Sequence, residues 1–184
     1  MSKILKFSSR RDKLSAFEAL IRPHVEPLYK LAYRFTNNAM EAEDLTQDLL
    51  VKLYPKVNEL EKVEKLRPWL ARVMYRMWVD KLRSKRVAPT EAADDIGALE
   101  QNVEVTDPES IPEQAYHRSF TRRKLLQALE QLSEEHRIVL ILHDVEGYSL
   151  EEMKVVLDCA IGTLKSRLHR ARERLKNLLD DGTF

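Results

Sequence analysis

A stretch without lysine or arginine divides this chain and constrains its fold more than any other feature. Residues 87–116 hold eight aspartates or glutamates, three prolines and no basic residue. Hydrophobic residues follow no sustained period there, which is typical of a linker. On both sides of it they recur at the spacing of helices. The sequence therefore predicts two small helical units, in residues 1–86 and 119–184, joined by a flexible acidic linker in residues 87–118.

The composition favours an all-α fold for both units. Hydrophobic residues make up 43% of the 184 positions, which is enough to bury a core. Glycine, on which tightly turned all-β folds and phosphate-binding loops depend, occurs only four times. No segment alternates between hydrophobic and polar residues for long enough to require a sheet.

The sequence lacks the residue combinations of a catalytic or metal site. The five histidines do not have the close spacing of zinc ligands. There is no nucleophile–base set and no glycine-rich phosphate loop. We therefore expect no enzymatic activity, no metal, no cofactor and no small-molecule substrate.

The cysteine content and the distribution of apolar residues favour the cytoplasm. The single cysteine, Cys159, cannot form a disulfide within the chain, which suits a reducing compartment. The first residues contain no apolar run of signal-peptide length. No segment approaches the roughly 20 apolar residues of a membrane span. We expect a cytoplasmic protein.

The C-terminal unit has the pattern of a helix-turn-helix. Ser133 is expected to cap a helix that ends at Gly147. Ser149 and Glu152 have the spacing of a capping box, which would open a short second helix. Asp158 falls in a predicted turn, and aspartate is one of the few residues that tolerate a left-handed backbone. A third helix after this turn would complete the motif.

That third helix, expected from Ile161 onward, has one apolar side when it is projected at 100° per residue. The apolar side carries Ile161, Leu164, Leu168, Ala171, Leu175 and Leu178. The opposite side carries Thr163, Ser166, His169, Arg170 and Glu173. The two flanks carry Lys165, Arg167, Arg172 and Arg174.

The basic side of this helix has two interpretations. A solvated surface usually mixes acids and bases in pairs four residues apart, yet residues 162–176 hold six Lys or Arg and one acid. A helix that enters a DNA groove needs short polar side chains and arginines at base edges, with cations beside them for phosphates. DNA binding fits better. The residues expected to contact DNA are Thr163, Lys165, Ser166, Arg167, His169, Arg170 and Arg172.

A second basic helix is expected in the N-terminal unit. Residues 67–86 hold seven Lys or Arg and one acid, and Pro68 suits a first helical turn. One stripe carries Arg72, Arg76, Asp80 and Arg83, with Trp69 and Tyr75 beside it. Arginines next to aromatic rings suit single-stranded nucleic acid, whose bases stack and whose phosphates need cations. The alternative, which the residues alone favour, is that Trp69 and Trp78 are core residues.

An acidic amphipathic helix precedes this basic helix. Asn38 and Glu41 have the spacing of a cap pair at its start. Its polar positions Asp44, Gln47 and Asp48 face either solvent or a partner, and the pattern alone does not decide between them.

Three segments read EAEDLTQDLLVKLY, RPWLARVMYRMWVDKLRSKR and GYSLEEMKVVLDCAIGTLKSRLHRARERL. They resemble segments of bacterial RNA polymerase sigma factors of the extracytoplasmic function (ECF) group. The resemblance covers about residues 17–179. It implies a region-2-like helical bundle, the acidic linker and a region-4-like helix-turn-helix, in that order, with no room for a region-3-like domain.

The resemblance implies an alternative sigma factor that binds core RNA polymerase and directs transcription initiation at promoter DNA. The contacts with the clamp helices of the β′ subunit would come from Asp44, Gln47 and Asp48, and the region-4-like unit would meet the β flap. The −10 element would meet the loop at 57–65 and Trp69, Arg72, Arg76 and Arg83. Arg76 stands where the family usually has asparagine, so a phosphate contact suits it better than base reading. The helix-turn-helix would read the −35 element.

The resemblance also implies a role for the linker and a further partner. The acidic linker would pass through the RNA exit channel and imitate nascent RNA among cationic walls. ECF proteins are commonly held by an anti-sigma factor, so such a partner is expected here.

Two other classes of protein remain open. One is a stand-alone helix-turn-helix transcriptional regulator that does not act through core polymerase, with an N-terminal unit that senses a ligand or dimerises. The second basic helix and the acidic linker disfavour it, because a simple repressor needs neither. The other is a helical adaptor that only binds proteins and has no dependence on DNA.

Overall fold

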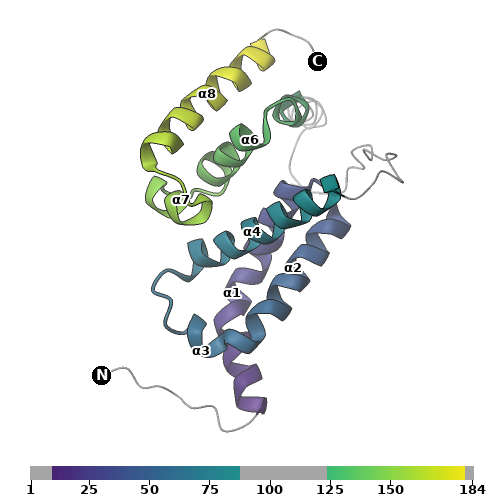
Figure 1. Ribbon diagram of the computed structural model, residues 1–184, viewed down its shortest axis with the longest axis vertical. Coiled ribbons are helices and arrows are strands. Elements are labelled where there is room, and N and C mark those ends of the chain that lie inside the picture. Colours follow the sequence, from purple (N-terminus) through teal and green to yellow (C-terminus); the bar gives the residue numbers. More distant parts are fainter. Residues whose placement is uncertain (1–9, 88–123, 181–184) are drawn as a thin grey trace, which may run out of the picture.

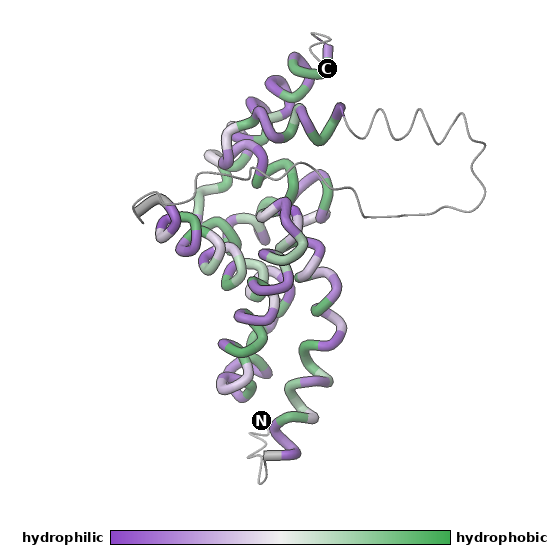
Figure 2. The backbone as a smooth tube through the Cα atoms, turned by 90° about the vertical axis from the view of Figure 1, so that its right-hand side faces the viewer, coloured by the Kyte–Doolittle hydropathy of each residue, from purple (hydrophilic) through white to green (hydrophobic). Residues whose placement is uncertain are grey.

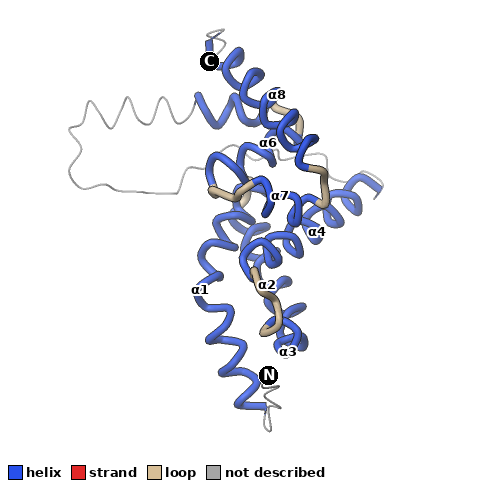
Figure 3. Tube along the Cα trace, turned by 90° about the vertical axis from the view of Figure 1, so that its left-hand side faces the viewer, coloured by secondary structure: helices blue, strands red, loops and turns tan. Residues whose placement is uncertain are grey.

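The structure is a computed structural model that describes residues 10–87 and 124–180. Every described residue lies in a helix or in a connecting loop (Figure 3). The predicted all-α fold is therefore confirmed for this part of the chain. The predicted linker, residues 87–118, lies outside the described residues except for Val87, where a helix ends.

Long helices α1 (Arg10–Thr36), α2 (Ala39–Leu53) and α4 (Leu66–Val87) build the N-terminal unit. The 3-10 turn η1 (Tyr54–Lys56) and the short helix α3 (Val57–Leu60) connect α2 to α4. Helices α1 and α2 lie side by side, and α4 packs against both (Figure 1). This unit is the helical bundle that the sequence predicts.

Helix α1 runs for 27 residues although it contains Pro23 and Pro27. Each proline removes a backbone N–H from the helical ladder, which costs about 3 kcal/mol in an isolated helix. One side of α1 carries the buried residues Phe17, Ile21, Leu28, Leu31, Ala32 and Phe35. Burial of this row in the bundle offsets the cost of the prolines.

The turn between α1 and α2 uses two asparagines. Asn37 has φ 53°, in the left-handed region that asparagine tolerates better than most residues. Asn38 caps α2 as predicted, because its side chain accepts a hydrogen bond of 3.1 Å from the backbone N–H of Glu41. The carboxylate of Glu41 makes no reciprocal cap and instead accepts a hydrogen bond of 2.6 Å from Lys85 of α4.

Amphipathic helices form the core of the bundle. Each of these helices carries both hydrophilic and hydrophobic residues along its length (Figure 2). Helix α2 buries Ala42, Leu45, Leu49 and Leu53, and α4 buries Leu70, Ala71, Met74 and Trp78. The Trp78 ring stacks on that of Phe35 with 5.1 Å between centroids. Trp78 is therefore a core residue, which is the alternative that the residues alone favour.

The C-terminal unit contains helical residues 124–130, α6 (Glu134–Leu140), the π-helical turn η2 (Ile141–Val145), α7 (Leu150–Leu157) and α8 (Ile161–Asp180). Helix α6 packs against α8, and α7 also contacts α8. Helices α7 and α8 form the predicted helix-turn-helix, and α8 begins at the predicted residue.

Helix α6 begins at the predicted position, but without the expected capping bond. Ser133 occupies the N-cap position, but its side chain makes no capping hydrogen bond. Its backbone carbonyl accepts the first helical bond, from the N–H of Arg137 at 2.9 Å. Glu134 and Glu135 in the first turn provide favourable negative charge at this helix end, so the helix begins without a hydroxyl cap.

The helix predicted to run up to Gly147 does not stay α-helical to its end. From Ile141 it is π-helical, and the N–H of Glu146 donates to the Ile141 carbonyl at 2.9 Å. Gly147 then ends the element with φ 69°, a left-handed conformation that suits glycine. The predicted end of the helix at Gly147 is confirmed.

Helix α7 begins and ends as the sequence predicts. The Ser149 hydroxyl accepts a hydrogen bond of 3.2 Å from the Glu152 N–H, and the Glu152 carboxylate accepts one of 2.9 Å from the Ser149 N–H. This is the predicted capping box. At the other end Asp158 is left-handed, with φ 53° and ψ 48°.

Replacing Ser149 with alanine is expected to lower the free energy of unfolding by about 1 kcal/mol, because the first turn of α7 loses its hydroxyl acceptor. Urea unfolding followed by circular dichroism measures this loss. Ser84→Ala is the control, because the Ser84 hydroxyl only donates back to the Asp80 carbonyl within α4. Equal losses in the two variants would contradict the capping role.

The apolar side of α8 is the predicted one. Leu164, Leu168 and Ala171 are buried, and Ile161, Leu175 and Leu178 are half-buried. This burial fixes the rotation of α8 about its axis. It therefore also decides which side chains face outward.

The two units pack together in the free chain. Helix α7 lies against α4 (Figure 1). Buried residues of both units belong to one continuous core, among them Leu70 of α4 and Met153 and Val156 of α7. The helix-turn-helix therefore rests on the second basic helix, a contact that the sequence does not predict.

Candidate nucleic-acid interface

The outward side of α8 presents the predicted polar and basic residues to solvent. Thr163, Lys165, Ser166, His169 and Arg170 are all exposed. The Ser166 hydroxyl donates to the Thr163 carbonyl at 2.9 Å, and His169 Nε2 lies 3.5 Å from the Glu173 carboxylate. Arg170 has no ion-pair partner within the described part of the chain. The centre of this face is therefore open to a ligand.

Two of the arginines on the flanks of α8 are already paired. Arg167 lies 3.0 Å from the carboxylate of Glu135 on α6. Arg172 donates from Nε at 3.0 Å and from a terminal nitrogen at 2.5 Å to the carboxylate of Asp144 on η2. These pairs hold α8 against α6 and η2. A DNA phosphate would have to compete with these carboxylates. Lys165 is exposed and has no carboxylate partner among the described residues, so a phosphate can reach it without such competition.

The Arg172 pair makes the stability of this unit depend on pH. The hydrogen bond from Arg172 is the main cause of the lowered pKa of Asp144. A carboxyl group whose pKa is lower in the folded than in the unfolded state stabilises the fold at pH values above the ordinary aspartate pKa. This stabilisation is lost as the pH falls through the lower pKa of the folded state.

We therefore expect Asp144→Asn to lower the midpoint of urea unfolding at pH 7, and the difference from the parent to shrink below about pH 4. The exposed pair contributes at most about 1 kcal/mol. Urea titrations at pH 7 and at about pH 3 measure the change, with Asp80→Asn on α4 as the control. A difference from the parent of the same size at both pH values would remove the ion pair as its cause.

The arginines of α4 that were predicted to meet the −10 element face the helix-turn-helix. Terminal nitrogens of Arg72 and Arg76 lie 3.4 and 3.3 Å from the Asp158 carboxylate. The buried Nε of Arg72 has no hydrogen-bond partner within the described residues. Trp69 is half-buried against the core, and Arg83 is exposed. The structure thus brings Arg72 and Arg76 to the α7–α8 turn, whereas Arg83 remains on the open part of α4.

Helix α2 exposes the three residues predicted to contact polymerase. Asp44, Gln47 and Asp48 are exposed, and Asp48 lies 2.7 Å from the ammonium group of Lys81 on α4. Met40 and Val51, at 73% and 75% exposed, flank Asp44 and Gln47 on the same side of the helix. The sequence analysis did not single out these two apolar residues. Their spacing of about three helical turns in the sequence could have placed them on the same side of the helix.

Contacts between the two units also escaped the sequence reasoning. Arg34 of α1 forms an ion pair with Glu146. Arg67 of α4 donates to the Glu146 carbonyl, and its guanidinium lies over the Tyr148 ring, 4.2 Å from the centroid. Arg34 and Glu146 are 112 residues apart, so no local pattern signals the pairing.

Neither a metal site nor a membrane-spanning helix is present among the described residues. They contain no cluster of histidine, cysteine and acidic side chains that could hold a metal ion. Within the same residues, no helix combines the length and the apolar character needed to cross a bilayer.

Sequence profiles of two known families match the chain. The profile of Sigma-70 region 2 matches residues 20–87, and that of Sigma-70 region 4 matches residues 122–175. The matches correspond to the two helical units and together cover more than half of the chain.

Curated relatives are similar over most of the chain. The chain is 33% identical over 167 residues to the ECF RNA polymerase sigma factor SigE of Mycolicibacterium smegmatis, which covers 90% of the chain and 62% of that relative. It is 28% identical to the ECF RNA polymerase sigma factor SigW of Bacillus subtilis, over 94% of the chain and 93% of that relative. It is 31% identical to the RNA polymerase sigma-H factor of Pseudomonas aeruginosa, over 92% of the chain and 89% of that relative.

Solved structures with the same fold include two complexes that are similar over most of this chain. The sigma factor RpoE of Bartonella quintana, in complex with the anti-sigma factor NepR, is 27% identical with a TM-score of 0.65, over 89% of this chain and 96% of that one. CnrH, in complex with the cytosolic domain of CnrY, is 21% identical with a TM-score of 0.60, over 96% of this chain and 92% of that one. The second likeness shows the fold alone.

The fold and the site define a class of protein with two helical units, the second a helix-turn-helix with an exposed basic helix. Within that class, the chain belongs to the ECF group of RNA polymerase sigma factors.

Proposed function

We propose that this chain is an alternative sigma factor, which binds core RNA polymerase and directs transcription initiation at selected promoters. The observation that carries the proposal is the open face of α8, where Thr163, Ser166, His169 and Arg170 are exposed together in a chain that matches both sigma regions. A sigma factor must both hold core polymerase and read promoter DNA.

Helix α8 reads the −35 element in duplex DNA. Arg170 and the short polar side chains of Thr163 and Ser166 approach base edges, which arginine and hydroxyl groups bind specifically. Lys165 contacts the phosphates beside the groove, and Arg167 and Arg172 do so when they leave their carboxylate partners. Burial of the apolar side of α8 in the unit supports this orientation.

Helix α4 acts on the −10 element. Arg72, Arg76 and Arg83 neutralise phosphates of the melted strand, and Trp69 borders the stripe on which they lie. Single strands suit such a surface, because their bases stack on aromatic rings and their phosphates need cations. Trp69 is half-buried, so its part is limited to the exposed fraction of its ring.

Helix α2 docks on core polymerase through one exposed face, which we place against the clamp helices of β′. Met40, Asp44, Gln47 and Val51 follow one another at spacings of four, three and four residues, and Asp48 lies beside them. Exposed apolar residues that flank acidic and amide groups are typical of a protein interface. By family resemblance, the C-terminal unit meets the β flap.

We also propose an anti-sigma partner and a place of action. The two solved structures described above are complexes, one of them of a sigma factor with an anti-sigma factor, and this supports a protein inhibitor for this chain. The protein acts in the cytoplasm, where core polymerase transcribes. It contributes recognition, and the chemistry of RNA synthesis belongs to the core enzyme.

Size-exclusion chromatography of the chain with bacterial core RNA polymerase tests the proposal. We expect the chain to co-elute with the core and to be displaced by an excess of another sigma factor. A stand-alone regulator would elute apart from polymerase and bind duplex promoter DNA by itself. That pattern would overturn the proposed function in favour of the regulator.

A further inference from the structure

We infer that His143 and Asp144 position Arg172 for a DNA phosphate, and that protonation of His143 releases this arginine, so that binding of the −35 element strengthens as the pH falls. This inference rests on the proposed function, which assigns α8 to the −35 element, and deepens it. The cluster itself lies within the C-terminal unit. His143 and Asp144 belong to η2, and Arg172 belongs to α8.

Arg172 lies where a phosphate contact is expected. It follows Lys165 by seven residues, close to two helical turns, so both side chains project from the same flank of α8. The carboxylate of Asp144 occupies the donors of Arg172 and also repels a phosphate. Release of the arginine would therefore add a second cation to the flank where Lys165 meets the DNA backbone.

Two side chains compete for one oxygen of Asp144. A terminal nitrogen of Arg172 donates to Oδ1 at 2.5 Å, and Nδ1 of His143 lies 2.7 Å from the same oxygen. That nitrogen of Arg172 also lies 3.3 Å from Nδ1 of His143. Nε of Arg172 donates to the other carboxylate oxygen at 3.0 Å. How firmly Asp144 holds Arg172 therefore depends on the hydrogen at Nδ1 of the imidazole.

The protonation state of His143 decides this competition. In the neutral ring, Nδ1 without a hydrogen accepts a hydrogen bond from Arg172. In the imidazolium both ring nitrogens are donors, so Nδ1 can only donate to Asp144, and the positive ring repels the guanidinium. Protonation therefore loosens the pair of Asp144 and Arg172 and adds a positive charge beside α8.

The chemistry of the three groups sets the pH range of the release. The hydrogen bond from Arg172 is the main cause of the lowered pKa of Asp144, so that carboxyl group stays ionised above about pH 5. Arginine stays charged throughout the range in which proteins are folded. An imidazole ordinarily changes its charge near pH 6.5. Between about pH 8 and about pH 6, the change within this cluster is therefore the protonation of His143.

Other charged groups near η2 do not take part in the cluster. Helices α6 and α7 pack against η2. Glu134 and Glu135 lie in the first turn of α6, at the end away from η2, and Glu152 caps α7. Glu146, which follows η2, pairs with Arg34. Within the described part of the chain, the remaining titratable residues of α6 and α7 make no hydrogen bond or ion pair with the cluster. They are His136, Arg137, Glu151 and Lys154.

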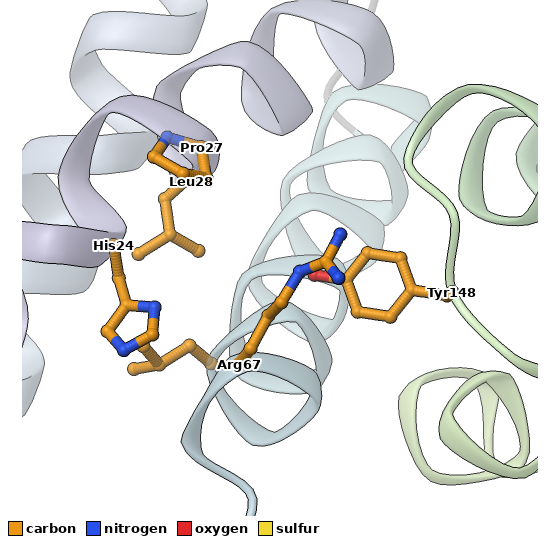
Figure 4. Close-up of a pocket in the computed structure, with 6 residues that line it drawn as sticks. His24, Pro27, Leu28, Arg67 and Tyr148 are labelled. Carbon is orange, nitrogen blue, oxygen red and sulfur yellow. The ribbon is translucent and has the colours of Figure 1, made fainter.

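The turn that carries the imidazole and the carboxylate is held in place from both sides. At its start Ile141 and Leu142 are buried. Beyond its end the N–H of Tyr148 donates to the Leu142 carbonyl at 2.9 Å. Tyr148 is only 4% exposed, and its ring lies under the guanidinium of Arg67 (Figure 4). The part that moves on release is therefore the long side chain of Arg172, which is 52% exposed.

The affinity of the holoenzyme for a duplex promoter fragment tests the release on DNA. The fragment comes from a transcript start that the holoenzyme selects from a randomised library. Fluorescence anisotropy measures the affinity at about pH 8 and about pH 6, at several salt concentrations. His143→Gln removes the titrating ring, and Asp144→Asn removes the carboxylate. His169, on the exposed face of α8, is present in every variant, so its own titration cancels in the comparison.

Two control variants match these changes. His136→Gln removes a half-buried histidine of α6 and leaves the cluster intact, so it should keep the pH dependence of the parent. Glu18→Gln removes one negative charge at an exposed position of α1, so it accounts for the change in net charge of Asp144→Asn.

Lowering the pH is expected to strengthen DNA binding about fivefold more in the parent and in His136→Gln than in His143→Gln. The salt slope of the parent should increase by about one unit at the lower pH, because one more phosphate is neutralised. At about pH 8, Asp144→Asn should bind about fivefold more tightly than Glu18→Gln. An equal pH effect in the parent and in His143→Gln would overturn the role of His143. Equal affinities of Asp144→Asn and Glu18→Gln would overturn the role of Asp144.

Nuclear magnetic resonance of the free full-length chain observes the release without polymerase or DNA. With ¹⁵N-labelled arginine, the Nε–H signal of Arg172 is identified by its absence in Arg172→Lys, and Asp144→Asn gives the position of the released signal. We expect the parent signal to move towards that position between about pH 8 and about pH 6, and the signal of His143→Gln to stay. A parent signal that does not move would overturn the release.

The two measurements separate this inference from the proposed function. If the Arg172 signal moves but the holoenzyme selects no promoter, the proposed function is wrong and the release in the free chain stands. If the holoenzyme binds its promoter with the same pH dependence in the parent and in His143→Gln, the proposed function stands and the pH-dependent phosphate contact is wrong.

Discussion

Charge reversal at Asp44 and Asp48 is expected to weaken binding to core RNA polymerase by about a hundredfold, which corresponds to a loss of roughly 3 kcal/mol. Both carboxylates are exposed on the α2 face that Met40 and Val51 border. The Asp44→Arg/Asp48→Arg variant replaces favourable charges with repulsive ones at an interface, where such juxtapositions cost several kcal/mol. Fluorescence anisotropy of labelled chain titrated with core polymerase measures the affinity.

A matched variant separates this effect from a change in net charge. Glu18→Arg/Glu61→Arg makes the same change at two exposed positions outside α2 and should bind core polymerase like the parent. Because Asp48 also pairs with Lys81, urea unfolding must show that the test variant is folded. Equal core affinities of the test and control variants would remove the assignment of α2. Met40→Ala/Val51→Ala tests the apolar part of the same face.

Replacing Arg170 with alanine is expected to relax the preference for one or two base pairs of the −35 element, at a cost of about 1–3 kcal/mol at the preferred base. Arg170 is exposed at the centre of the α8 face, where a recognition helix approaches base edges. The measurement uses the complete holoenzyme, a panel of −35 substitutions and several salt concentrations. A loss of affinity that is equal for every −35 variant would mean that Arg170 does not face the groove.

Lys165→Ala provides the contrasting variant. A phosphate contact carries no sequence information, so its loss should weaken binding to all −35 variants alike and reduce the salt slope by about one unit. Arg172 also lies on a flank of α8. Lys165 is the cleaner choice, because Arg172→Ala would also remove the arginine partner of Asp144.

Features that depend on neighbours along the chain could be predicted from the sequence. The capping box of Ser149 and Glu152, the left-handed Asp158 and the buried side of α8 all follow from local backbone chemistry and helical period. The same reasoning placed the exposed faces of α2 and α8. Ser133 shows the limit of reasoning from local sequence, because a serine at the N-cap position does not always make the capping hydrogen bond.

Contacts between distant segments could not be predicted from the sequence. Nothing local signals that Arg34 meets Glu146 or that Asp158 meets Arg72 and Arg76, since these pairs depend on how the two units dock. The arginine stripe of α4 was visible, but its partner in the free chain was not. The change to a π-helical turn at Ile141 also has no sequence signal of the kind that marks caps and turns.

The central claim, that this chain directs core polymerase to promoters, is tested most directly by mapping transcript starts. Core RNA polymerase transcribes a library of DNA fragments with randomised upstream sequence, with and without the chain, and the 5′ ends of the transcripts are sequenced. We expect starts that appear only with the chain and share two sequence elements at the −35 and −10 positions, and Arg170→Ala should relax only the −35 element. If the chain leaves the starts of core polymerase unchanged, or if the new starts share no upstream element, the central claim is contradicted.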